Sequence, residues 1–133
     1  YVPIGVVAGI STWNFPVVLS IWKIAPALLT GNTLVLKPSP FTPMTVLRIG
    51  ELVRDLVPAG VLNIITGGDA LGPMMTAHPG VDKVSFTGST ATGRRVMQSA
   101  SPTLKRLTLE LGGNDAAIVL PDVDIAETAQ RLL

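Results

Sequence analysis

The chain has 133 residues, no cysteine and one histidine, and its ten basic and nine acidic side chains leave a formal net charge of +1. This length suits one domain. Without cysteine these residues can form no disulfide framework, thiolate metal site or cysteine nucleophile, and His78 alone cannot hold a metal. The near-neutral balance gives no basic face for nucleic acid, so we expect neither a metal site nor a nucleic-acid partner.

The first half of the chain alternates short apolar runs with longer helical stretches. The first run is apolar on both faces, as buried parallel strands are. The first helical stretch has Pro16 in its first turn, and Pro26 should bend or divide it. Apolar residues at spacings of three and four make the second helical stretch amphipathic. The pattern predicts strands at residues 4–10 and 33–37 and helices at residues 16–30 and 42–57.

The second half continues the alternation. Asp122 or Asp124 can cap a final helix. His78, Arg94 and Arg95 are interpreted as structural or solvent-exposed side chains, and Trp22 in the first half as a core residue. Strands are predicted at residues 61–65, 83–87, 104–111 and 116–120, with helices from Asp69 to about His78, at residues 91–100 and at the end of the chain.

Charge is scarce and unevenly placed. Charged residues make up 14% of the chain, against about 25% in a typical soluble domain, and residues 1–47 contain only Lys23 and Lys37. Prolines, glycines and a polar cluster interrupt the uncharged start, so we expect no membrane span. The chain opens with Tyr1, which suggests an internal piece of a longer protein. A cytoplasmic location is then the default expectation, because targeting signals could lie outside this segment.

The alternating pattern predicts an α/β fold: a parallel sheet with helices on both faces. Ligands bind such sheets at the carboxyl ends of the strands. Small or polar residues gather after five strands, at residues 11–14, 37–39, 67–69, 88–90 and 110–113. We therefore expect a ligand site at this edge, where free N–H groups at helix starts favour phosphate.

Neither common phosphate-binding fingerprint is present. Residues 88–93 have the glycine spacing of a P-loop, but Arg94 and Arg95 stand where that motif needs Lys and Ser or Thr. No G-x-G-x-x-G follows the first strand. Dinucleotide binding would therefore need another geometry.

Four motifs in register resemble the aldehyde dehydrogenase superfamily. They lie at residues 12–16 (TWNFP), 31–39 (GNTLVLKPS), 86–90 (FTGST) and 109–114 (LELGGN), and the resemblance covers essentially all 133 residues. It implies that residues 1–133 are a single partial NAD(P)-binding domain of Rossmann-like type, without the catalytic and oligomerisation domains. The whole protein would then be an NAD(P)-dependent aldehyde dehydrogenase and a homo-oligomer.

The resemblance implies two catalytic residues. The Asn14 amide would help hold the oxyanion of a tetrahedral intermediate, which suits a fixed neutral donor; the alternative is a cap for the helix that begins near Pro16. Glu110 would be the general base that activates water against an acyl-enzyme thioester; the alternative is an exposed acid in a loop.

The resemblance also implies a cofactor site for NAD or NADP. Lys37 would donate to the adenosine ribose hydroxyls, unless it is a solvated lysine at a strand end. Gly88 and Ser89 would contact the pyrophosphate, and Ser89 can cap a helix at the same time. Gly67 and Gly68 would wall the adenine pocket, unless they only form a tight turn. The remaining candidates are Ile10, Ser11, Thr12, Trp13, Ser39, Pro40, Phe86, Thr92, Leu111 and Gly112.

Three departures from the family limit these expectations. Pro40 stands where many members have a glutamate on the ribose hydroxyls, so the choice between NAD and NADP stays open. Asp69 stands where a glycine is common. The nucleophilic cysteine lies downstream of Glu110 in the family and is absent here, so we expect this chain alone to have no aldehyde oxidation activity.

Two other functions are compatible with the residues. One is a non-catalytic module that retains nucleotide binding or serves as an interaction surface. The other is a branch of the superfamily that passes the acyl group to coenzyme A or phosphate, which Glu110 disfavours because such enzymes have less need of a hydrolytic base. As an interior segment, the chain should expose apolar sheet edges and faces and self-associate.

Overall fold

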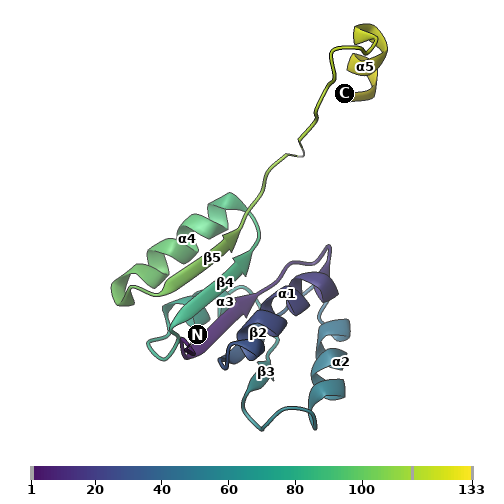
Figure 1. Cartoon of the computed structure of the whole chain (residues 1–133). Helices are drawn as coiled ribbons and strands as arrows, with labels where there is room; N and C mark the ends of the chain where they lie inside the picture. The colour runs from purple at the N-terminus through teal and green to yellow at the C-terminus, as the bar shows by residue number, and fades with distance from the viewer. Residues whose placement is uncertain (1, 115, 133) are drawn as a thin grey trace.

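The computed structural model describes residues 2–114 and 116–132, and its centre is one five-stranded parallel sheet (Figure 1). The strands are β1 (Val6–Ile10), β2 (Thr33–Lys37), β3 (Leu62–Ile64), β4 (Lys83–Thr87) and β5 (Arg106–Glu110). Their order across the sheet is β3-β2-β1-β4-β5, and every neighbouring pair is parallel. The predicted α/β class is therefore confirmed.

Helices cover both faces of this sheet. The covering helices are α1 (Pro16–Leu29), α2 (Met44–Val53), α3 (Leu71–Ala77) and α4 (Thr90–Ala100); the 3₁₀ turn η1 (Ser101–Thr103) follows α4, and α5 (Ile125–Leu132) follows β5. The chain builds outward from β1 to β3 and then crosses back to place β4 on the other side of β1. Right-handed crossovers therefore put α1 and α2 on one face and α3 and α4 on the other. The strand order reverses between β1 and β4, which is where such sheets bind ligands.

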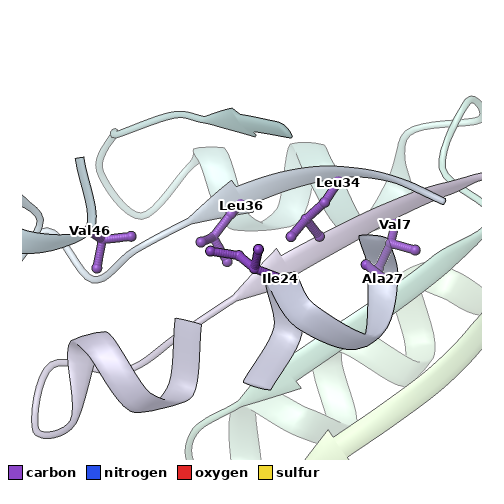
Figure 2. Packing of buried hydrophobic residues seen from close by; sticks show 6 residues of the cluster. All are labelled: Val7, Ile24, Ala27, Leu34, Leu36 and Val46. Atoms are coloured by element: carbon purple, nitrogen blue, oxygen red, sulfur yellow. The ribbon is translucent and has the colours of Figure 1, made fainter. Parts of the chain in front are cut away.

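The two faces of the sheet have separate apolar cores. On the α1 and α2 face, Val7, Leu34 and Leu36 from the strands meet Ile24, Ala27 and Val46 from the helices (Figure 2). On the other face, Ala8, Val84 and Phe86 pack with Met75, Val81 and Val96. Successive residues of a strand point to opposite faces, so the continuous apolar runs read from the sequence supply both cores.

Asn32 ties the start of β1 to the end of α1. This buried side chain accepts hydrogen bonds from the N–H groups of Ile4 and Gly5 through Oδ1, and its Nδ2 donates to the Ala27 carbonyl and to Thr30 Oγ1. The amide satisfies backbone groups that would otherwise be buried without partners, which is costly. It therefore fixes where the first helix ends against the sheet.

The predicted strand at residues 116–120 does not form. These residues are extended but unpaired, and Ile118, Val119 and Leu120 are exposed. After β5 the chain leaves the sheet, and α5 lies apart from it (Figure 1). A strand needs a neighbouring backbone to pair with, and an apolar run in the sequence does not show whether one exists. The final helix is capped by Asp124, whose Oδ1 accepts from the Glu127 N–H at 2.9 Å.

Three local expectations about the helices need correction. Pro26 does not divide α1, which runs through it into its last turn. The second helix begins at Met44, later than predicted, because a residue that precedes a proline is disfavoured in helical geometry and Thr42 precedes Pro43; it also ends earlier than predicted, at Val53. Trp22 is 67% exposed and is not a core residue. No helix within the described residues is long and apolar enough to cross a membrane.

Candidate functional site

A cavity of about 450 Å³ lies at the carboxyl edge of the sheet, on the α3 and α4 face. Its strand-end residues are Ile10, Lys37 and Phe86. They meet because the register pairs Ile10 with Lys37 on one side and with Phe86 on the other. This volume falls within the range of roughly 300–1,000 Å³ that is usual for small-molecule sites.

Two helical walls complete this cavity. From α4 come Thr92, Arg95, Val96 and Ser99, which recur at spacings of three and four and so share one helix face. From α3 and the residues before it come Asp69, Gly72, Pro73 and Thr76 at the same spacings. A hydrogen bond of 2.7 Å from Ser99 Oγ to Thr76 Oγ1 joins the two walls.

Lys37 is the cation at the base of the cavity. The residue is 6% exposed, and within residues 2–114 and 116–132 its ammonium forms no hydrogen bond or ion pair. A mostly buried ammonium that lines a cavity without a partner is suited to receive an acceptor from a ligand. The arrangement differs from a solvated lysine at a strand end.

Four of the predicted cofactor residues line the cavity: Ile10, Lys37, Phe86 and Thr92. Arg95 also lines it, although the sequence pattern indicated only a solvent-exposed side chain. Its position on the same helix face as Thr92, three residues later, was the available signal. Asp69, seen in the sequence only as a departure from the family, lies in the opposite wall.

Ser89 and Gly88 form the turn between β4 and α4. Ser89 caps the helix, since its Oγ accepts from the Thr92 N–H at 3.2 Å. The Gly88 N–H donates to the Glu110 carbonyl at 3.0 Å and so belongs to the sheet. A Cβ on Gly88 would lie 2.5 Å from the Phe86 ring, which explains why this position needs glycine.

Other predicted cofactor residues lie around the same edge but outside the lining of the cavity. Ser11 and Ser39 are buried and use their hydroxyls internally: Ser11 shares a hydrogen bond of 3.0 Å with Ser20, and Ser39 accepts from the Phe41 N–H at 3.3 Å. Thr12 and Gly67 are half-buried. The exposed ones are Trp13, Pro40, Gly68, Ser89, Leu111 and Gly112.

Asn14 lies in the exposed loop between β1 and α1. Its Oδ1 accepts a hydrogen bond of 2.6 Å from Thr12 Oγ1, and α1 has no side-chain cap. The capping alternative is therefore not supported. Because the oxygen is held by Thr12, the Nδ2 group is the end of the amide left to donate to a ligand; it has no hydrogen-bond partner among the residues that the structure covers.

Glu110 ends β5 beside Thr87, its partner in the strand register. Leu107 and Leu109 pack into the core beneath α3 and α4, so the alternation along the strand points Glu110 toward the α1 face. On that face Lys23 of α1 donates to Thr87 Oγ1 at 2.7 Å. Glu110 therefore has a lysine close by, while the cavity lies on the other face of the same edge.

Lys23 is the functional candidate that the sequence motifs did not indicate. Burial lowers its pKa from 10.5 to about 8, and the attraction of the Glu110 carboxylate works against that decrease. The residue is 5% exposed. A signal was present: Lys23 is one of two charges in residues 1–47 and lies in an otherwise apolar helix.

A model of the aldehyde dehydrogenase family matches residues 1–133, and the chain belongs to this family. It is 51% identical over 132 residues to aldehyde dehydrogenase LUC3 from Fusarium, covering 99% of this chain and 28% of that protein. The chain thus spans about a quarter of the length of the curated relatives that it matches.

Two solved structures show the same fold. Betaine aldehyde dehydrogenase from Staphylococcus aureus, in complex with NAD⁺, has a TM-score of 0.81 and 46% sequence identity to this chain. The match covers 84% of this chain and 22% of the dehydrogenase chain. An NADP dependent enzyme from Escherichia coli has a TM-score of 0.82 and 49% identity, covering 85% of this chain and 24% of its own. Dependence on NAD or NADP is the norm in this family.

Proposed function

We propose that this chain supplies the cofactor cleft and two catalytic side chains of an NAD(P)-dependent aldehyde dehydrogenase. The enzyme would oxidise an aldehyde to a carboxylic acid through a thioester on a cysteine that these 133 residues do not contain. The observation that carries the proposal is the Lys37 ammonium, which has no partner among the residues that the structure describes and lines a cavity at the strand-order reversal, where doubly wound sheets bind nucleotides. The whole protein is expected to be a homo-oligomer that takes an aldehyde substrate.

Lys37 would hold the adenosine half of the cofactor. Its ammonium is positioned to donate to ribose hydroxyls, because it ends β2 at the base of the cavity. The start of α4, which Ser89 caps, would lie near the pyrophosphate, where the positive end of the helix dipole favours an anion. When bound, the cofactor accepts hydride from the substrate.

Asn14 would stabilise the negative charge that develops on the substrate oxygen. The hydrogen bond from Thr12 fixes the amide oxygen, so the Nδ2 group keeps a defined direction without help from the substrate. A donor that is already oriented costs no reorganisation during the reaction. The Nδ2 group would therefore serve as one donor of an oxyanion hole.

Glu110 would activate the water that releases the acid. A general base must lie within hydrogen-bond reach of the water whose proton it takes. Lys23 lies near this carboxylate and, with a pKa of about 8, is mostly protonated at neutral pH. Lys23 would thus support Glu110 without itself contacting the substrate.

Cofactor binding by the chain itself tests the proposal. Calorimetric titration with NAD and NADP should detect binding of at least one of them, and Lys37→Met should weaken that binding about tenfold, as the loss of a charged hydrogen bond does. Lys83→Met is the matched control, because Lys83 begins β4 at the opposite edge of the sheet. Equal affinities for the two variants would contradict the assigned site.

A further inference from the structure

Arg95 and Lys37 line one cavity from different directions. Lys37 ends β2 at the base, and Arg95 lies in the α4 wall beside Val96, which is buried. Arg95 itself is exposed, so solvent and ligands can reach its side chain. The cavity therefore has two cations that approach a bound molecule from two elements.

Neither cation is neutralised by a partner within the part of the chain that the structure describes. Arg48 and Arg131, by contrast, form ion pairs of 2.6 Å with Glu51 and Glu127. The cavity lining includes one carboxylate, Asp69, and no ion pair joins it to Arg95 or Lys37 in the described residues. The lining thus has two positive charges against one negative charge and favours an anionic ligand.

We propose that Arg95 is a specificity-determining residue of this cavity, where with Lys37 it binds a phosphate on the 2′-hydroxyl of the adenosine ribose, so that the site takes NADP. The proposal rests on the proposed function, which places Lys37 at the ribose hydroxyls. A phosphate on one of those hydroxyls would then lie beside Lys37, in the space that Arg95 also lines. Arginine suits this role because its planar guanidinium can bind phosphate through two parallel hydrogen bonds.

The one carboxylate of the cavity lining, Asp69, works in part against this specificity. A carboxylate that accepts from the ribose hydroxyls favours NAD and repels a 2′-phosphate. Pro40, which stands where many family members have a glutamate on the ribose hydroxyls, offers no carboxylate. Asp69 lies in the wall opposite the α4 residues. We expect Asp69 to weaken 2′-phosphate binding without abolishing it, so Asp69→Asn should increase affinity for a 2′-phosphorylated ligand.

Two adenosine nucleotides that differ only in the 2′-phosphate separate this proposal from cofactor binding in general. The chain should bind adenosine 2′,5′-bisphosphate more tightly than adenosine 5′-monophosphate in calorimetric titration. Arg95→Ala should weaken the bisphosphate about tenfold, which is about 1.4 kcal/mol, and change the affinity for the monophosphate less than twofold. Arg95→Lys should keep part of the preference, because it keeps the charge.

Arg94→Ala is the matched control. Arg94 lies on the same helix and is exposed, but it does not line the cavity. Its replacement by alanine changes the net charge by the same amount as Arg95→Ala. It should leave both affinities within about twofold. Binding of the monophosphate with no gain from the 2′-phosphate, or equal losses in the Arg94 and Arg95 variants, would overturn the proposal. If neither nucleotide binds, the cofactor site itself is wrong, and the role of Arg95 with it.

Discussion

The Lys23 ammonium lies 2.7 Å from Thr87 Oγ1 and joins helix α1 to strand β4 across 64 residues of sequence. Thr87 pairs in register with Glu110 at the end of β5. A single buried cation therefore connects the helix that begins after Asn14 with β4, the strand that pairs with the strand ending in Glu110.

The first prediction concerns the pH dependence of stability. Because the pKa of Lys23 falls from 10.5 to about 8 on folding, the unfolded chain binds more protons than the folded chain between these values. The free energy of unfolding should therefore increase as the pH rises from about 8 towards 10.5. Chemical denaturation at several pH values measures this slope, and Lys23→Met should remove the contribution.

Lys83→Met supplies the control for that measurement. Lys83 is half-buried at the amino end of β4, and the pH profile of this variant should parallel that of the unmodified chain. If the Lys23 variant kept the same slope between pH 8 and 10.5, the lowered pKa would be wrong.

The second prediction concerns Asn32. Replacing it by alanine leaves two backbone N–H groups without an acceptor and removes two further hydrogen bonds. Asn32→Ala should therefore lower the free energy of unfolding by about 2 kcal/mol or more. Asn63→Ala removes a single exposed hydrogen bond to the Gly60 carbonyl and should cost less than about 1 kcal/mol. A comparable loss in both variants, in urea denaturation, would show that Asn32 has no special role.

The third prediction concerns the close packing of Gly88 on Phe86. A Cβ at Gly88 would lie 2.5 Å from the ring and must displace it, whereas a Cβ at Gly68 has nothing within 4 Å. Gly88→Ala should lower stability by about 1–3 kcal/mol through overpacking and weaken nucleotide binding, because Phe86 lines the cavity. Gly68→Ala, which meets no such clash, should leave stability unchanged. Unaltered nucleotide affinity in Gly88→Ala would argue against Phe86 as part of the site.

The fourth prediction concerns the exposed apolar side chains of α1. Trp22 and Leu29 are 67% and 86% exposed, and Val17, Val18 and Ile21 are partly exposed beside them. Exposed apolar surface of this kind favours association, so the chain should self-associate as its concentration rises. Sedimentation velocity measures this, and Trp22→Glu should reduce it without lowering stability. A monomer at every concentration would contradict this interpretation of the low charge content.

The order of strands and helices could be predicted because it depends on local periodicity. The alternation of β-branched runs with helical spacing in residues 4–110 gave every element of the sheet and the edge at which the ligand residues gather. The strand expected at residues 116–120 failed for a physical reason, since pairing depends on a partner that no local pattern reveals. The start of α2 was missed because Pro43 limits where the helix can begin.

The candidate site was predicted less completely than the fold. The family resemblance indicated Ile10, Lys37, Phe86 and Thr92, which do line the cavity, but the roles proposed for Lys23 and Arg95 depend on contacts between distant segments. Lys23 meets Thr87 only after the sheet is assembled. Arg95 faces the cavity only because α3 packs against α4. Such contacts are set by tertiary packing, and in the sequence they are indicated at most by an isolated charged residue.

The fifth prediction tests the central claim, which is that Glu110 is the base of an aldehyde dehydrogenase. In a full-length aldehyde dehydrogenase that includes these residues, Glu110→Gln should still reduce about one equivalent of NAD(P) in a burst, because hydride transfer precedes thioester hydrolysis. Its steady-state rate should then fall by roughly 100-fold or more. Glu51→Gln, which changes an exposed acid on α2, is the control and should keep full turnover. Rapid-mixing measurements of NAD(P)H absorbance record both phases. A burst followed by slow turnover is the predicted result for Glu110→Gln. Unchanged steady-state turnover in this variant would contradict the assignment.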